Sequence, residues 1–174
     1  FDVDDVDTAF AELDARYLVG EGAAYAHTWS LIANVYAGFN RHRLPATTTD
    51  CVGIDHRSLV SAEGDLPASI PGAVWDQMPD MRIRMESVHR LSDLGTVVTH
   101  TAHGVTPEGF DAEWRMIFLY TVQDDLLNRY EVFDEAHLDA ALARFDELQS
   151  QTRRLENAAS QVGERYQACF SARD

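Results

Sequence analysis

The spacing of apolar residues along this chain changes once, near Met81. Before that point apolar side chains recur every three to four residues, which is the period of an amphipathic helix. This pattern predicts helices over residues 5–18 and 28–42, and a short helix within 64–80 that two prolines interrupt. Between the second and third helices, residues 51–57 are predicted to form a short strand.

After Met81 apolar residues alternate with polar ones, which is the period of a strand with one buried face. Turn sequences at residues 93–95, 106–109 and 123–125 divide this part into four strands, and an amphipathic helix over 135–149 follows. Helices followed by antiparallel strands predict an α+β fold. We expect a cone-shaped, curved, mainly antiparallel sheet that packs on helices along one face and encloses a pocket.

Composition limits the partners of such a domain. The chain has 174 residues, enough for one domain with extra elements. Its 29 acidic and 14 basic residues give a net charge of −15, and the basic residues are scattered arginines. We therefore expect neither nucleic acid nor an anionic membrane as a partner. Cys51 and Cys169 lack metal-type spacing and the first residues are acidic, so we expect a cytoplasmic protein with no signal peptide, metal site or cofactor.

The two ends of the chain resemble each other. Residues 1–14 align with residues 133–146 at an offset of 132, with six identical positions and three that are apolar in both. This predicts one unit of a tandem array, although two amphipathic helices rich in Ala and Asp can also match by chance. We expect an N-terminal linker helix in residues 1–27, the main domain in 28–134, and C-terminal helices in 135–174 that begin a following repeat.

Three segments carry a resemblance to a known superfamily, namely residues 28–44, 52–57 and 128–134. On these segments the chain resembles the nuclear transport factor two-like superfamily, and within it the SnoaL-like polyketide cyclase branch. The resemblance implies a cone-shaped fold, also described as a cystatin-like α+β roll, and a homodimer formed through the outer face of the sheet. It leaves the function open, because this fold hosts isomerases, cyclases, epoxide hydrolases and non-catalytic binding modules. Similar units occur in multidomain actinobacterial proteins.

Glu131 is the first candidate for acid–base chemistry, and the resemblance suggests it. In the epoxide hydrolase branch one catalytic carboxylate comes from the last strand, just before a Phe-Asp pair that this chain also has. An apolar wall disfavours the charged form of a carboxylate, which suits a general acid or base. The alternative is a salt bridge from Glu131 to Arg115 or Arg129 at the rim of the sheet. The Arg-x-Asp pair of that branch has no counterpart here, and His103 is the expected partner instead.

The strand over residues 51–57 supplies a second carboxylate. Alternation places Asp55 and Arg57 on one side of the strand and His56 on the other. We expect Asp55 at the pocket with Arg57 beside it, either to keep Asp55 ionised or to bind an anionic group of a ligand. The alternative is an ion pair at the edge of the sheet. His100 and His103 lie on opposite faces of their strand, so they do not form a joint metal site.

Aromatic residues are the remaining candidates, and we expect Tyr36, Trp75, Trp114 and Phe118 to contact a ligand together with Arg57. Pockets lined in this way bind apolar small molecules and orient them with a few polar groups. The first hypothesis is therefore a small-molecule-binding or regulatory module of a larger protein. The alternative is a SnoaL-like cyclase, isomerase or epoxide hydrolase that uses Glu131 or Asp55 with His103.

Overall fold

The computed structural model describes residues 12, 15–20, 22–57, 64–65 and 70–171. The helix predicted over residues 5–18, and with it the first half of the sequence repeat, falls mostly outside these residues. In chain order the elements are η1 (Ala23–Tyr25), α2 (Ala26–Phe39), β1 (Thr47–Asp55), β2 (Gly64–Asp65), α3 (Ile70–Gln77), β3 (Arg82–Ser92), β4 (Gly95–Val105), β5 (Asp111–Gln123), β6 (Leu126–Asp134), η2 (Glu135–His137) and α4 (Leu138–Ser171).

The strands form one six-stranded sheet in the order β2-β1-β6-β5-β4-β3. β1 runs parallel to β6, and every other neighbouring pair is antiparallel. The predicted α+β fold with a mainly antiparallel sheet is therefore confirmed. The four long strands begin and end within a few residues of their predicted positions. β1 begins at Thr47, earlier than the predicted residue 51.

Two tight turns fix the register of the long strands. Asp124 and Asp125 have positive φ angles of 50° and 65° between β5 and β6, a conformation that Asp and Asn tolerate in short hairpins. Gly95 has a φ of 157° at the start of β4, where a Cβ atom would lie 1.9 Å from the carbonyl oxygen of Tyr120. Only glycine allows so close an approach of two strands.

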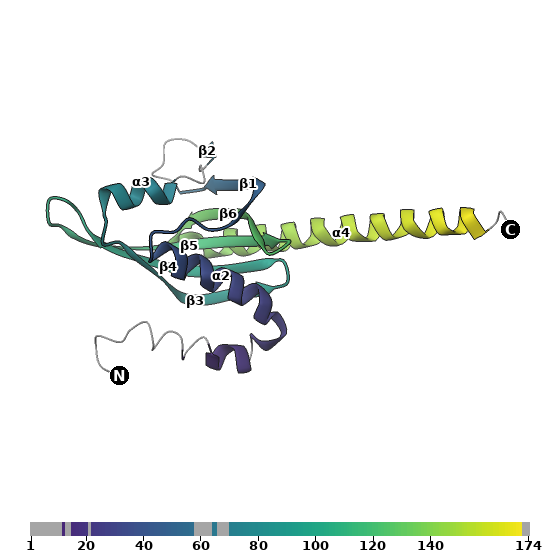
Figure 1. The fold of residues 1–174 in the computed structure, drawn as a ribbon, viewed down its shortest axis with the longest axis horizontal. Helices are drawn as coiled ribbons and strands as arrows, with labels where there is room; N and C mark the ends of the chain where they lie inside the picture. The colour runs from purple at the N-terminus through teal and green to yellow at the C-terminus, as the bar shows by residue number, and fades with distance from the viewer. Residues whose placement is uncertain (1–11, 13–14, 21, 58–63, 66–69, 172–174) are drawn as a thin grey trace.

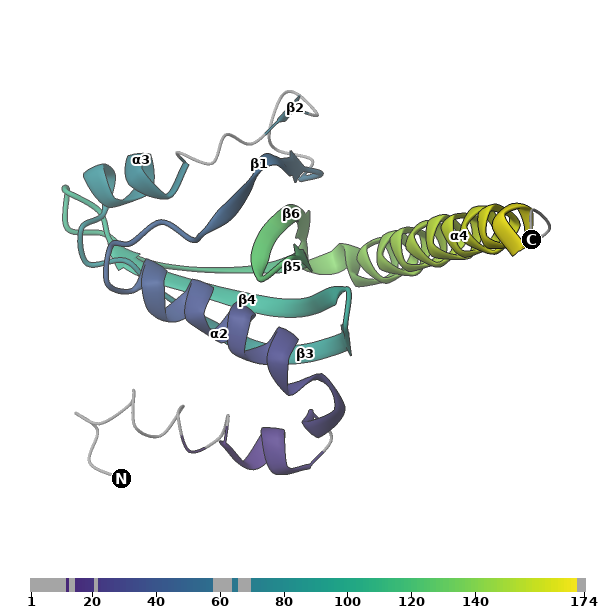
Figure 2. The same ribbon diagram turned by 45° about the vertical axis from the view of Figure 1, so that its right-hand side comes forward.

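The inner face of the sheet carries α2, which lies across β3 and β4 (Figure 1 and Figure 2). Its buried residues Ile32 and Tyr36 pack on Val98, Ala102 and other apolar residues of the sheet. The side chain of Asn40 follows the helix and hydrogen-bonds both the N–H and the carbonyl of Ile83, at 2.8 and 2.9 Å. This link fixes the end of α2 to the edge strand β3.

The outer face carries the first turns of α4. Ala141 and Phe145 of the helix form a second buried core with residues from three strands, namely Val97, Ile117, Leu119 and Phe133. Helices thus cover both faces of the sheet, and the expectation that they cover one face is wrong. The reason is that Leu138, Ala141, Phe145 and Leu148 form an apolar stripe at helical spacing, which matches the apolar outer-face positions of β4, β5 and β6.

α4 is one continuous helix of 34 residues, where the sequence suggested several C-terminal helices. Its distal part extends away from the sheet in both views (Figure 1 and Figure 2), and Leu155 is 72% exposed. None of the helices in the described ranges, α4 included, combines the length and the apolar content that a membrane crossing requires.

Candidate functional site

A cavity of about 400 Å³ lies between the inner face of the sheet and the helices α2 and α3. Most of its wall is apolar, and it includes Phe39, Val74, Ile83, Met116, Phe118 and Val132. Six of its described lining residues have polar side-chain groups: Thr47, Arg57, His100, Trp114, Tyr120 and Tyr130. The volume lies within the range of small-molecule sites, and the few polar groups can orient a ligand.

His100 lies on β4 and forms part of the cavity wall. It is 4% exposed, and its ring stacks on Phe118 with centroids 4.5 Å apart. Burial lowers the pKa of His100 to about 3, so the imidazole is neutral at physiological pH. Its Nδ1 lies 3.2 Å from the hydroxyl of Tyr36.

Two tyrosines extend this contact into the core. The rings of Tyr36 and Tyr120 lie edge to face, with centroids 6.2 Å apart. Burial raises the pKa of Tyr36 well above its usual value, and the neighbouring Tyr120 adds to the rise. Burial also raises the pKa of Tyr120, against a smaller lowering by the neighbouring hydroxyl of Tyr36. Both hydroxyls therefore stay protonated, and Tyr36 lies against two residues of the cavity wall, His100 and Tyr120.

Arg57 lies on the cavity wall and is paired with Asp55. The guanidinium donates hydrogen bonds to the carboxylate from Nη2 at 2.6 Å and from Nε at 2.9 Å, and its Nη1 lies 3.3 Å from Sδ of Met116. Asp55 is 2% exposed. Burial alone would raise the pKa of Asp55, but the hydrogen bonds from Arg57 outweigh it and the net pKa is lowered. As predicted, Asp55 and Arg57 lie on one side of the strand and His56 on the other. The carboxylate of Asp55 is ion-paired with Arg57.

Changing Asp55 to Asn is expected to lower the free energy of unfolding by about 1–2 kcal/mol at neutral pH, because charge-assisted hydrogen bonds are lost. The folded-state pKa of Asp55 is below its unfolded value, so the ionised group stabilises the fold above about pH 4 and this contribution is lost as the pH falls further. Urea unfolding of wild type and variant between pH 7 and 3 should show the difference narrowing at low pH. A difference that is constant with pH would contradict this origin.

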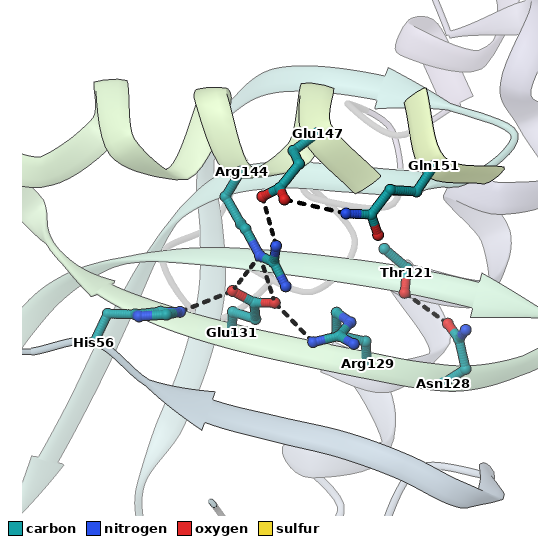
Figure 3. A network of polar contacts seen from close by, with 8 residues as sticks. All are labelled: His56, Thr121, Asn128, Arg129, Glu131, Arg144, Glu147 and Gln151. Carbon is teal, nitrogen blue, oxygen red and sulfur yellow. Dashed lines mark hydrogen bonds and ion pairs between the residues drawn. The ribbon is translucent and has the colours of Figure 1, made fainter. Parts of the chain in front are cut away.

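Glu131 lies on the outer face, not at the cavity as the sequence suggested. It is fully buried and accepts hydrogen bonds from Arg129 at 2.9 Å and Arg144 at 3.2 Å, with Nε2 of His56 at 2.7 Å. Figure 3 shows this group, the Glu131 cluster, facing α4. Residues of β6 alternate between faces, and the neighbours of Glu131, Tyr130 and Val132, reach the cavity. The predicted salt bridge to Arg129 is present.

The second predicted salt bridge of Glu131, to Arg115, is wrong. Arg115, the alternative partner of Glu131, instead donates a hydrogen bond to Glu86 at 2.8 Å. On α4, Arg144 also donates to Glu147 at 2.6 Å, and Glu147 accepts a hydrogen bond from Gln151 at 3.1 Å (Figure 3). The Glu131 cluster therefore joins β1, β6 and α4.

His103 points away from the cavity, and His100 lies at the cavity in its place. The side chain of His103 is 47% exposed, and its Nε2 lies 2.6 Å from a carboxylate oxygen of Asp111. β4 and β5 pair His100 with Met116 and Ala102 with Trp114. Residues paired across antiparallel strands lie on the same face, so the predicted apolar face of β5 could have identified His100 as the cavity histidine.

The predicted ligand contacts divide into two groups. Trp114, Phe118 and Arg57 line the cavity. Tyr36 does not line the cavity, but its hydroxyl contacts Nδ1 of His100, which does. Trp75 does not line it either, because its ring stacks on His42 with centroids 5.1 Å apart. As for metals, the described residues contain no group of three or more His, Cys, Asp or Glu side chains that could hold an ion.

Comparison with known proteins identifies the fold. By sequence the chain matches no protein family, and no curated protein matches it. Its structure resembles that of IdmH from Streptomyces antibioticus, a proposed polyketide cyclase, with a TM-score of 0.52, 18% identity, and coverage of 66% of this chain and 96% of IdmH. It also resembles TerC co-crystallised with polyporic acid, with a TM-score of 0.51, 18% identity, and coverage of 70% and 97%.

A third similar structure is the Δ5-3-ketosteroid isomerase from a Mycobacterium species, with a TM-score of 0.50, 18% identity, and coverage of 61% of this chain and 91% of the isomerase. At these identities the likeness shows the fold alone. The chain has the nuclear transport factor two-like fold that the sequence suggested.

Proposed function

We propose that this chain is a small-molecule-binding module whose ligand is an apolar compound enclosed in the inner-face cavity. The observation that carries the proposal is the chemistry of the wall: no carboxylate is found among the described residues that line the cavity. Acid–base catalysis needs a group that can exchange a proton near neutral pH. Burial lowers the pKa of His100 to about 3, and the nearby carboxylate of Asp55 is ion-paired with Arg57, so the wall supports ligand binding better than proton transfer.

The comparisons support an organic ligand for this module, and they also support a second candidate function. TerC has this fold and was crystallised with polyporic acid, which supports an organic ligand for the similar cavity here. IdmH and the ketosteroid isomerase support the second candidate, a cyclase or isomerase. In that case His100 or Tyr120 would contact the reacting group, because Glu131 and His103 lie on the other face. The module belongs in our proposal to a larger cytoplasmic protein.

A homodimer remains a prediction. It relied on apolar residues at the outer face of β5, and the structure shows α4 covering two of them, Ile117 and Leu119. Further along that face, Arg115 and Glu86 pair with each other. A dimer through the outer face would therefore have to form on a charged surface beside α4.

Filling the cavity tests the proposed function. Wild-type protein is expected to bind anilinonaphthalene sulfonate, a dye whose fluorescence rises in apolar surroundings. Ala102 is 3% exposed and its side chain faces the cavity. In an Ala102→Phe variant the added ring occupies the ligand volume, and steric overlap of about 1–3 kcal/mol predicts a tenfold to hundredfold weaker dye affinity in a fluorescence titration.

Ala140→Phe is the matched control, because Ala140 is exposed on α4 and the same side chain is added away from the cavity. The control should bind the dye as the wild type does. Equal dye affinity for Ala102→Phe and wild type, or no binding by the wild type, would contradict the proposed function.

A further inference from the structure

We propose that Arg41 and Arg43 bind an anionic group at the mouth of the inner-face cavity. The ligand is then an amphiphile, whose apolar body fills the cavity and whose charged end stays outside it. This inference rests on the proposed function and adds a polar site to it. It is carried by the position of the two arginines in the loop after α2 and by the charge of that loop.

The cavity opens beside this loop. Leu44 is 55% exposed and Trp114 is 38% exposed, and both line the cavity, so they lie where the ligand space meets water. Leu44 belongs to the loop between α2 and β1, which lies at the same end of the sheet as α3 and the β4–β5 hairpin (Figure 1 and Figure 2). Because Arg43 directly precedes Leu44 in the chain, its backbone lies at the mouth of the cavity.

Contacts with both neighbouring helices hold the loop in place. The N–H groups of Arg41 and Arg43 both donate hydrogen bonds to the carbonyl of Gly38 in α2, each at 2.9 Å. His42, between the two arginines, stacks on Trp75 of α3 with ring centroids 5.1 Å apart. The arginines are therefore attached to an ordered backbone, so an anion that binds there does not have to order the loop first.

The positive charge of the loop is left uncompensated. The side chains of Arg41 and Arg43 are exposed. Neither forms an ion pair within the described part of the chain, whereas most of the other arginines there do. The chain has a net charge of −15 and repels anions on average, so two such neighbouring cations are the exception. Each guanidinium offers a fork of N–H donors that matches a carboxylate or a phosphate.

The cavity itself favours an uncharged body. Arg57 is the only cation among the described residues of its wall, and it is paired with Asp55 at 2.6 Å. An anionic group buried there would lack a counter-charge. At the mouth the same group stays in contact with water and meets two arginines, so an amphiphile suits both regions.

Two probes with the same hydrocarbon chain, decanoate and decanol, test the inference by isothermal titration calorimetry at neutral pH. In the double variant Arg41→Gln/Arg43→Gln, decanoate is expected to bind about fivefold more weakly than to the wild type, the effect of two exposed charge contacts. Its affinity for decanol should not change. High salt should weaken the binding of decanoate to the wild type, and not that of decanol. Arg153→Gln/Arg154→Gln is the matched control, because it makes the same charge change at exposed positions of α4, and it should bind both probes as the wild type does.

Each other outcome has a definite meaning. Equal decanoate affinity for the wild type and the Arg41→Gln/Arg43→Gln variant would overturn the inference and leave the proposed function standing. An equal loss in the α4 control would do the same, because it would be an effect of net charge. Loss of decanol binding together with decanoate binding would show that the arginines support the cavity and not an anion, which also overturns the inference. Binding of neither probe by the wild type would overturn both the inference and the proposed function.

Discussion

Changing Glu131 to Gln is expected to lower the free energy of unfolding by about 3 kcal/mol, because the variant removes the buried negative charge of the Glu131 cluster, takes the carboxylate away from Arg129 and leaves Arg144 with the exposed Glu147. Glu131 has no exposed surface, whereas the side chains of Arg129 and Arg144 are 21% and 28% exposed. Water can reach these two arginines, which places the effect at the low end for a broken buried ion pair.

Urea unfolding followed by tryptophan fluorescence measures this loss, and thermal unfolding should show a melting temperature lower by about 10 °C for a chain of this size. Glu147→Gln is the matched control. Glu147 also pairs with Arg144, at 2.6 Å, but its side chain is 55% exposed, so the expected loss is below about 0.5 kcal/mol. Equal stability of Glu131→Gln and wild type would mean that the cluster does not stabilise the fold.

Changing Phe145 to Ala is expected to cost about 4 kcal/mol of unfolding free energy, the largest effect we predict. Phe145 is 1% exposed and fills the core between α4 and the outer face of the sheet. Its loss leaves a cavity that rigid strands on one side and a helix on the other can close only in part.

Leu155→Ala on the same helix provides the comparison, because Leu155 is 72% exposed. That substitution should change the unfolding free energy by less than about 0.5 kcal/mol. Urea unfolding of both variants also tests how α4 is attached. If the two substitutions had equal effects, the packing of the first turns of α4 on the sheet would not be the contact that holds the helix.

Much of the fold could be predicted because periodicity reports directly which face of an element is buried. The change near Met81 gave the four long strands, and the turn at Asp124 and Asp125 has a composition typical of hairpins. The extent of α4 was harder. The helix was predicted to end at residue 149, close to where its apolar contacts with the sheet end. The helix itself continues to Ser171, and its distal part does not pack on the sheet.

The site was predicted less well, and the errors on the strands have one cause. Alternation shows that neighbouring residues of a strand lie on opposite faces, but it does not show which face is the cavity when both faces are covered. β4 has buried residues on both sides, Val97 towards α4 and Val98 towards α2. His103 and Glu131 were therefore placed on the wrong face. Pairing β4 with the aromatic residues of β5 would have corrected His103, because cross-strand partners share a face.

The Glu131 cluster and the cavity use consecutive residues of the same two segments. His56 contacts Glu131 while Arg57 lines the cavity, and Glu131 is flanked by Tyr130 and Val132 of the cavity wall. Around these positions, residues that meet the ligand space alternate with residues that hold α4. A change of ligand preference in the course of evolution would thus be tolerated more readily at α2 and α3, whose cavity residues Val35, Phe39 and Val74 belong to elements that do not form the core with α4.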